Sequence, residues 1–357
     1  MSEDGKENSV PVWKRLLGES IVKLNTLPSS PRAHREKLME VISRYPMRIN
    51  PYYLGLIKEE NDPIYRQCVP DIRELDDKRA APDPLNEEGH SPVRGLTHRY
   101  PDRVLLLVSS ECAMYCRFCN RKRKVGQPGM VTDKSIEEGI DYIKAHREVH
   151  DVLLSGGDPL LLEDARLREI LSALHAITHV DIIRIGTRVP CTLPQRITPE
   201  LAGLLQEFHP LYMNVHFNHP VEITAEATLA CSRLADAGIP LGCQTVLLKG
   251  VNDDLHVMQK LMRKLLTIRV KPYYLFHGDP ARGTSHFRTS VSRGLNIIRG
   301  LQGHTSGLCF PHFAIDLLGG GGKVPLLPDY LTGRDGGSLL VTNYQGNAYR
   351  HPDGMDD

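Results

Sequence analysis

The sequence lacks the features that would place the protein in a membrane, outside the cell or on nucleic acid. It has no apolar run of the roughly 20 residues that a membrane-spanning helix needs. Its first residues, MSEDGKENSVPVWKRLL, contain no apolar signal-peptide core, so we expect a cytoplasmic protein without a membrane partner. The 44 Lys and Arg residues nearly balance the 43 Asp and Glu residues, which leaves a net charge of +1. A broad basic surface for nucleic acid is therefore not expected.

Cysteine is also scarce. The chain has eight cysteines among 357 residues, too few for a small disulfide-stabilised scaffold. Their placement is uneven, because Cys112, Cys116 and Cys119 lie close together. In a reducing compartment, clustered cysteines favour metal binding or redox chemistry over disulfides. The remaining composition, 41% hydrophobic and 24% charged, is that of a globular protein long enough to bury a large core.

Residues 1–94 differ from the rest of the chain because they mix proline-rich and charged stretches. Helical patterns lie near residues 11–25 and 33–45. Two further segments are ambiguous: Tyr52–Ile57 and Pro63–Cys68. We interpret this part as an N-terminal helical cap that ends in an irregular linker near residues 79–95.

Residues 95–303 alternate short apolar runs with helical stretches. Six runs look like buried strands: Val104–Val108, Val152–Leu154, Ile182–Ile185, Tyr212–Phe217, Cys243–Leu248 and Pro272–Phe276. Helical stretches lie near residues 132–145, 163–176, 224–237, 254–267 and 290–301, and another begins at Thr198-Pro199-Glu200. This alternation predicts an α/β fold with parallel strands joined by crossover helices. Because no GxGxxG follows the first strand, a partial (β/α)6 barrel is favoured over a dinucleotide-binding fold.

Residues 304–357 form a short C-terminal segment. It contains another apolar run, Leu308–Asp316, followed by four glycines and a lysine, Gly319 to Lys323. The last part reads as a polar tail with one strand, Ser338–Thr342.

The strongest chemical signal is the spacing CxxxCxxC of Cys112, Cys116 and Cys119, directly after the first strand of the barrel. Loops at this place carry active sites in strand–helix barrels. Iron–sulfur clusters are normally held by four thiolates, so three close cysteines suggest a [4Fe–4S] cluster with one iron left open. The alternatives are a zinc knuckle and cysteines that are merely buried.

Two glycine-containing segments are weaker signals. Ser155-Gly156-Gly157-Asp158 ends the second strand, where glycines let a backbone approach a ligand closely, although an ordinary turn has the same composition. The glycine run before Lys323 can pass near a planar or anionic ligand, and a lysine in a shielded turn can form a Schiff base. A flexible surface loop with a solvated lysine is the alternative there.

The motifs together resemble the lysine 2,3-aminomutase family of radical SAM enzymes, which also use pyridoxal 5'-phosphate (PLP). The resemblance covers residues 95–330 and rests on these segments in order: HRYPDRVLLLV, CAMYCRFCNRKR, LLSGGDPL, IRIGTRVP, NVHFNHP, VLLKGVND, HFRTSVSRG, GHTSG and DLLGGGGKVP. It implies a radical SAM barrel whose [4Fe–4S] cluster is held by the three cysteines and whose open iron binds S-adenosylmethionine.

The resemblance also implies roles for single residues. Lys323 carries PLP, and its phosphate lies near Arg99, Tyr100 and Arg103. The residues expected at S-adenosylmethionine are Ser155, Gly156, Gly157, Asp158, His216 and Gln244. Arg121 is expected to pair with the carboxylate of the substrate.

Substrate choice depends on two aspartates in this comparison. Lysine-acting members receive the terminal ammonium of the substrate at positions that correspond to Asp279 and Asp316, whereas glutamate-acting members carry lysine and asparagine there. A buried ammonium needs paired carboxylates. The structural alternatives are a turn residue for Asp279 and a cap of the glycine loop for Asp316. Arg282 is expected to bring an additional cation near this site.

The resulting expectation is an isomerase that moves the α-amino group of L-lysine from C2 to C3 and gives β-lysine. It would need a one-electron donor of flavodoxin or ferredoxin type, and the formation of a homo-oligomer stays open. One alternative keeps the chemistry but acts on ornithine, arginine or a protein-bound lysine of an elongation factor. The other is an iron–sulfur protein for electron transfer or sensing, which would not need PLP.

Overall fold

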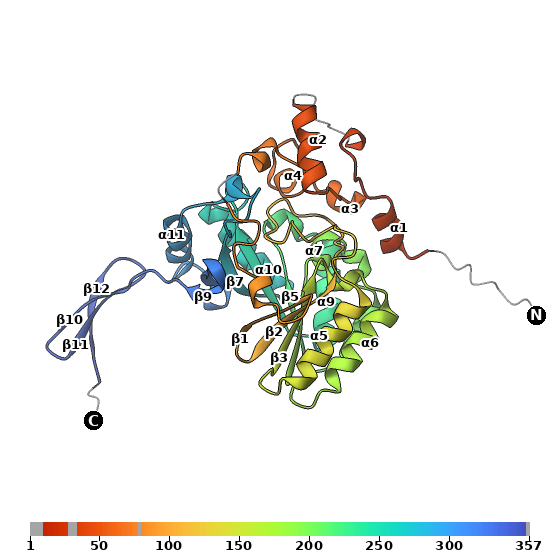
Figure 1. Cartoon of the computed structure of the whole chain (residues 1–357). Coiled ribbons are helices and arrows are strands. Elements are labelled where there is room, and N and C mark those ends of the chain that lie inside the picture. Colours follow the sequence, from red (N-terminus) through yellow and green to blue (C-terminus); the bar gives the residue numbers. More distant parts are fainter. Residues whose placement is uncertain (1–9, 28–33, 78–79, 355–357) are drawn as a thin grey trace, which may run out of the picture.

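The computed structural model describes residues 10–27, 34–77 and 80–354 (Figure 1). Its centre is a nine-stranded sheet, nearly closed into a barrel, in the order β1 to β9. The strands are β1 Leu96–Tyr100, β2 Arg103–Ser109, β3 Asp151–Gly156, β4 Ile182–Thr187, β5 Leu211–Val215, β6 Leu241–Leu247, β7 Lys271–His277, β8 His312–Leu317 and β9 Gly322–Pro325. Strands β2 to β8 are parallel, and β1 and β9 pair antiparallel at the two edges. The predicted α/β fold and partial barrel are confirmed.

Six helices connect or follow the parallel strands: α5 Asp133–Ala145, α6 Asp164–His175, α8 Pro199–Gln206, α9 Ala225–Asp236, α10 Leu255–Thr267 and α11 Val291–Leu301. Their starts follow local capping chemistry. The side chain of Thr132, for example, accepts the N–H of Ser135. The side chain of Thr198 accepts the N–H of Leu201, and Pro199 occupies the first position of α8, where proline is tolerated. The apolar face of each helix packs on the sheet. The strands of the sheet are therefore buried and rich in Val, Ile and Leu.

The described part of the N-terminal cap contains the α-helices α1 Val12–Gly18, α2 Arg35–Arg44, α3 Pro51–Leu54 and α4 Pro63–Cys68. The helix expected over residues 11–25 therefore ends early, at Gly18, which has no side chain to pack. Of the two ambiguous segments, Pro63–Cys68 is helical throughout and Tyr52–Ile57 only as far as Leu54. Asn50 and Asp62 cap the two helices, which begin with proline. The short helix α7 Val189–Thr192 follows β4. None of the helices in the described residues combines the length and apolar character needed to cross a membrane.

The C-terminal segment differs from expectation in two ways. The apolar run that begins at Leu308 supplies β8, which adds a further parallel strand beside β7. The tail holds three antiparallel strands rather than one: β10 Leu331–Asp335, β11 Ser338–Thr342 and β12 Ala348–Pro352. They project from the barrel (Figure 1). Strands β10 and β12 were missed because their sequences, LTGRD and AYRHP, have no clear apolar alternation.

The linker is irregular in backbone but fixed in position. Ala81 pairs with Ala281 in an isolated bridge, and the carbonyl of Pro84 accepts the N–H of Gly319 at 2.9 Å. The linker therefore contacts both the loop after β7 and the glycine run, although both segments are far from it in the sequence.

Candidate active site

One cavity inside the barrel brings the predicted site residues together. Its volume is about 630 Å³, within the range of about 300–1,000 Å³ usual for small-molecule sites. The predicted residues that line it are Arg99, Tyr100, Arg103, Cys112, Cys116, Cys119, Arg121, Ser155, Gly156, Gly157, Asp158, His216, Gln244, Asp279, Asp316 and Lys323. Arg99 and Tyr100 lie on β1, Arg103 at the start of β2 and Lys323 on β9. The others lie on parallel strands or in the loops that follow them, where strand–helix barrels place their chemistry.

The three cysteines lie in the loop after β2. Burial raises the pKa of Cys112 well above its usual value and that of Cys119 to about 11. A buried cation approaches them, because Nη1 of Arg188 donates to Sγ of Cys116 at 2.7 Å. Within the described residues, no three His, Cys, Asp or Glu side chains are grouped closely enough to hold a single metal ion. Three soft sulfur donors line one cavity, which is the donor chemistry of an iron–sulfur cluster.

The glycines after β3 are required by close packing. A Cβ atom on Gly156 would lie 2.2 Å from the carbonyl oxygen of Ser109, and Gly156 has φ of 131°. A Cβ atom on Gly157 would lie 2.2 Å from the carbonyl oxygen of Glu111. These contacts hold the end of β3 against the loop that leads to Cys112. The packing alone explains the glycines, and it leaves their backbone on the cavity wall.

Asp158 joins two neighbouring strand ends. One carboxylate oxygen accepts from Oγ1 of Thr187, and the other accepts from the backbone N–H of Arg188, both at 2.7 Å. Burial raises the pKa of Asp158 despite these hydrogen bonds. Its carboxylate therefore orients the β4 end that carries Arg188, in addition to lining the cavity.

His216 stands on the same wall, directly after β5. Its ring lies 5.6 Å from that of Phe118, a residue between two of the cysteines. Burial lowers the pKa of His216 to about 3, so the imidazole is neutral at physiological pH. Nε2 lies 2.9 Å from Oδ1 of Asn218, and Gln244 lines the cavity from β6. Both side chains offer neutral hydrogen-bonding groups near the cysteine loop.

The opposite end of the cavity contains a lysine paired with a buried carboxylate. Nζ of Lys323 lies 3.1 Å from Oδ2 of Asp316, and Nη1 of Arg99 lies 3.5 Å from Oδ1. That Oδ1 atom is buried and has no hydrogen-bond partner among the described residues. The hydroxyl of Tyr100 accepts the N–H of Lys323 at 2.9 Å, and the guanidinium of Arg103 stacks 3.8 Å above the ring of Tyr100. A lysine beside clustered arginines suits a ligand that carries a carbonyl group and a phosphate.

Asp279 lies between this lysine and the cysteine loop. Nδ2 of Asn120 donates to its Oδ2 at 2.7 Å. Burial raises the pKa of Asp279 to about 6, and the neighbouring charge of Asp316 adds to the rise, while the Asn120 hydrogen bond opposes it. A cation bound beside Asp279 would favour the ionised form of this carboxyl group.

Arg121 is held from outside the barrel. Its Nε donates to Oε1 of Glu87 in the linker at 2.6 Å, which leaves the guanidinium end on the cavity wall. Burial alone would raise the pKa of Glu87, but Arg121, Lys124 and Arg123 lower it to about 2. This carboxylate is therefore ionised and fixes the orientation of Arg121.

Arg282 does not approach the cavity, contrary to expectation. Its Nε donates to the carbonyl oxygen of Ala80 at 3.0 Å, and its backbone N–H bonds to Ala81. The side chain is exposed and belongs to the contact between the linker and the loop after β7. No additional cation therefore faces Asp279 from this position.

Three residues of the site were missed by sequence reasoning. Arg188 lies in the segment IRIGTRVP, which was noted as a motif without a role for its arginine. Asn120 directly follows the third cysteine, and its position was the available signal. Glu87 lies in an irregular linker, and nothing local to it indicates a partner 34 residues away.

Comparisons with known proteins identify the family. The model of the Radical SAM superfamily matches residues 106–261, and one described as Lysine-2,3-aminomutase matches residues 298–356. The L-lysine 2,3-aminomutase of Acetoanaerobium sticklandii is 51% identical over 92% of this chain and 80% of that protein. That of Clostridium subterminale is 49% identical over 94% and 82%, respectively. A glutamate 2,3-aminomutase of Clostridioides difficile is 44% identical over 98% and 84%.

These matches determine the reaction class. They do not determine the substrate, because relatives named for lysine and for glutamate have similar sequence identity to this chain, so the substrate has to be inferred from the residues of the cavity. Radical SAM membership implies a [4Fe–4S] cluster, S-adenosylmethionine, a small-molecule substrate and a reductant. The chain belongs to the lysine 2,3-aminomutase family of radical SAM enzymes and is an aminomutase, that is, an isomerase.

Proposed function

We propose that this protein is a PLP-dependent radical SAM aminomutase that moves the α-amino group of L-lysine from C2 to C3 and releases β-lysine. The observation that carries the proposal is the pair Asp279 and Asp316 on the wall of the cavity that also contains Lys323. Burial and the charge of Asp316 disfavour the ionised form of Asp279, and the terminal ammonium of lysine would stabilise it. The terminal carboxylate of glutamate would be repelled there.

Lys323 is the proposed attachment point for PLP, which supplies, when bound, an electron-delocalising ring that eases migration of the amino group. Arg99, Tyr100 and Arg103 are the proposed phosphate ligands. The pairing of Lys323 with Asp316 keeps the amine oriented within the site. Because Arg99 faces the same carboxylate at 3.5 Å, a phosphate would give this arginine a second anionic partner.

Arg121 is the proposed partner of the substrate carboxylate. Glu87 contacts only the Nε of Arg121, so the two terminal nitrogens of Arg121 remain for a bidentate contact. With the carboxylate at Arg121 and the ammonium at Asp279 and Asp316, the substrate would be held at both ends. Such fixation places one C–H bond reproducibly and reduces the entropic cost of reaction.

Cys112, Cys116 and Cys119 are the proposed cluster ligands. Ser155, Gly156, Gly157, Asp158, His216 and Gln244 are the proposed contacts of S-adenosylmethionine. Neutral His216 and the buried wall exclude water, which protects a radical from side reactions. In this organisation, the chain divides into a cap of residues 1–94, whose described part lies over the barrel, the radical SAM barrel of residues 95–303, and the segment of residues 304–357 that provides Lys323.

The test is an anaerobic assay of the reconstituted enzyme with PLP, S-adenosylmethionine, a chemical reductant and one amino acid at a time. We expect β-lysine from L-lysine, with no product when either organic cofactor is omitted. Product from ornithine, arginine or glutamate in place of lysine would overturn the substrate assignment. Cleavage of S-adenosylmethionine without product from any free amino acid would point to a protein-bound lysine instead.

A further inference from the structure

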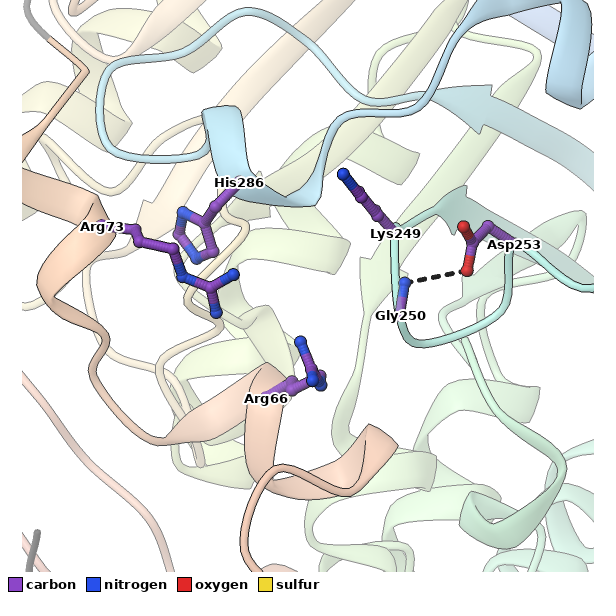
Figure 2. A pocket seen from close by; sticks show the side chains of 6 residues that line it. All are labelled: Arg66, Arg73, Lys249, Gly250, Asp253 and His286. Carbon is purple, nitrogen blue, oxygen red and sulfur yellow. Dashed lines mark hydrogen bonds between the residues drawn. The ribbon is translucent and has the colours of Figure 1, made fainter.

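A second cavity opens on the surface beside the cysteine loop. Its volume is about 540 Å³. Its lining residues come from α4, from the turn after it, from the loop between β6 and α10 and from the turn after β7: Arg66, Arg73, Lys249, Gly250, Asp253 and His286 (Figure 2). None of the predicted site residues belongs to it.

The cavity presents three cationic side chains, of which Arg66 is held by a hydrogen bond from its Nε to the carbonyl oxygen of Asn61 at 2.7 Å. Arg73 pairs with Asp71, and Asp253 accepts the N–H of Gly250 at 2.8 Å. Among the described residues, no ion pair involves Arg66 or Lys249. His286 adds no charge, because burial lowers its pKa to about 4, and both of its ring nitrogens are buried without a hydrogen-bond partner in the described part of the chain. The opening therefore complements an anionic surface.

One wall of this cavity leads to a cysteine through two hydrogen bonds. Arg66 precedes Gln67 in α4, and Oε1 of Gln67 accepts from Nη2 of Arg188 at 2.6 Å. Nη1 of Arg188 then donates to Sγ of Cys116 at 2.7 Å. The carbonyl of Gln67 also accepts the N–H of Arg117, inside the CxxxCxxC motif, at 2.9 Å.

The other wall reaches the same motif through aromatic rings. The backbone N–H of Lys249 donates to the carbonyl of Phe287 at 2.8 Å, and Phe287 follows His286. The ring of Phe287 lies 6.1 Å from that of Phe118, which stands between Cys116 and Cys119. The residues that line the cationic cavity are therefore in contact, through Gln67 and Phe287, with the loop that carries the three cysteines.

We propose that this cavity and its rim form the docking surface for the acidic protein that delivers single electrons to the enzyme. In the step, one electron leaves the reduced iron–sulfur centre or flavin of the donor and enters the oxidised [4Fe–4S] cluster, with no bond made and no proton moved. Carboxylates of the donor contact Arg66 and Lys249. The inference depends on the family's need for a reductant and not on the identity of the amino acid.

The experiment reverses one cation and compares two electron sources. Lys249→Glu changes an exposed side chain whose only described role is in this cavity. Lys144→Glu is the matched control, because it makes the same charge change at the last turn of α5, at the opposite end of the barrel. The probe is a plant-type [2Fe–2S] ferredoxin. Its affinity for each holoenzyme is measured by titration at low and moderate salt, and cluster reduction is followed by absorbance.

We expect Lys249→Glu to weaken ferredoxin binding about tenfold at low salt and to slow cluster reduction by ferredoxin to a similar extent. The difference should shrink as salt screens the charges. Reduction by dithionite should be unchanged in both variants, which separates donor docking from the radical chemistry.

Two results would overturn the docking proposal. One is equal ferredoxin affinity in the Lys249→Glu variant and the wild-type enzyme. If inorganic phosphate also binds the wild-type cavity in that case, the cavity is a site for small anions and not a docking surface. The other is an equal loss in Lys144→Glu, which would show an effect of total charge. Failure to make β-lysine with dithionite would count against the proposed substrate alone, because the binding and reduction measurements do not use it.

Discussion

The amide of Asn120 donates to Asp279 at 2.7 Å and so joins the residue after the third cysteine to a carboxyl group from the loop after β7. The hydrogen bond fixes Oδ2 and leaves Oδ1 available to a ligand. It also opposes the rise in the pKa of Asp279 that burial causes. A small polar side chain in the cysteine loop thereby controls the charge at the proposed ammonium site.

Replacing Asn120 with Ala should weaken lysine binding about tenfold, because a hydrogen bond to a charged group is lost. The pH dependence should change as well. Asp279 has a pKa of about 6, so wild-type affinity should fall as the pH drops through 6, where the carboxylate takes up a proton. Without the amide that midpoint should move upward. Substrate affinity measured from pH 5 to 8 tests this, and an unshifted midpoint would contradict it.

Asp279→Asn should weaken lysine binding about 30-fold or more, since one of two carboxylates facing the ammonium becomes neutral. The side chain keeps its size, so the cavity should not collapse. Arg282→Ala is the matched control from the same loop, and its exposed side chain bonds to Ala80 rather than to the cavity. Steady-state kinetics should change only in the first variant. Equal kinetics in both would remove Asp279 from the substrate site.

Lys323→Ala should abolish PLP retention and β-lysine formation while iron and sulfide contents stay at the wild-type level. The three cysteines belong to a different loop, so loss of the lysine should not affect them. The measurements are the visible absorbance of bound PLP after desalting and the iron content. An inactive variant with full PLP occupancy would refute the attachment role of Lys323.

Glu87→Gln should lower the free energy of unfolding by about 3 kcal/mol at pH 7, because it leaves Arg121 without its carboxylate, whereas Arg123 and Lys124 keep Glu88. The folded pKa of about 2 lies below the ordinary value of 4.5. Glu87 therefore stabilises the fold above pH 4.5, and this contribution is lost as the pH falls from 4.5 towards 2. Denaturant unfolding at pH 7 and pH 4 should show a smaller difference at the lower pH.

Features encoded within a few residues could be predicted from the sequence. The six apolar runs became parallel strands because burial on both faces selects Val, Ile and Leu. The resemblance to the family could be found because it rests on local segments in order, among them the spacing of Cys112, Cys116 and Cys119 and the glycine run before Lys323. The last helical pattern of the barrel, residues 290–301, matched α11 Val291–Leu301 for the same reason.

Features that depend on contacts across the chain could not be predicted. Glu87 meets Arg121, and Tyr100 meets the backbone of Lys323 across 223 residues, through backbone paths that no sequence pattern records. The error over Arg282 had the same origin. Its proximity to Asp279 in sequence suggested a shared site, but the pairing of Ala81 with Ala281 turns this side chain towards the linker.

In the linker, the number of residues between Ala81 and Glu87 matters as much as their identity. The linker must bring Ala81 to the loop after β7, Pro84 to the glycine run and Glu87 to Arg121, in that order and over a few residues. One inserted residue between Pro84 and Glu87 would misplace the carboxylate while every cysteine, glycine and lysine motif stayed intact. A homologue can thus retain the complete set of signature motifs and still lose its hold on the substrate carboxylate, so comparison of enzymes in this family should weigh linker spacing beside motif identity.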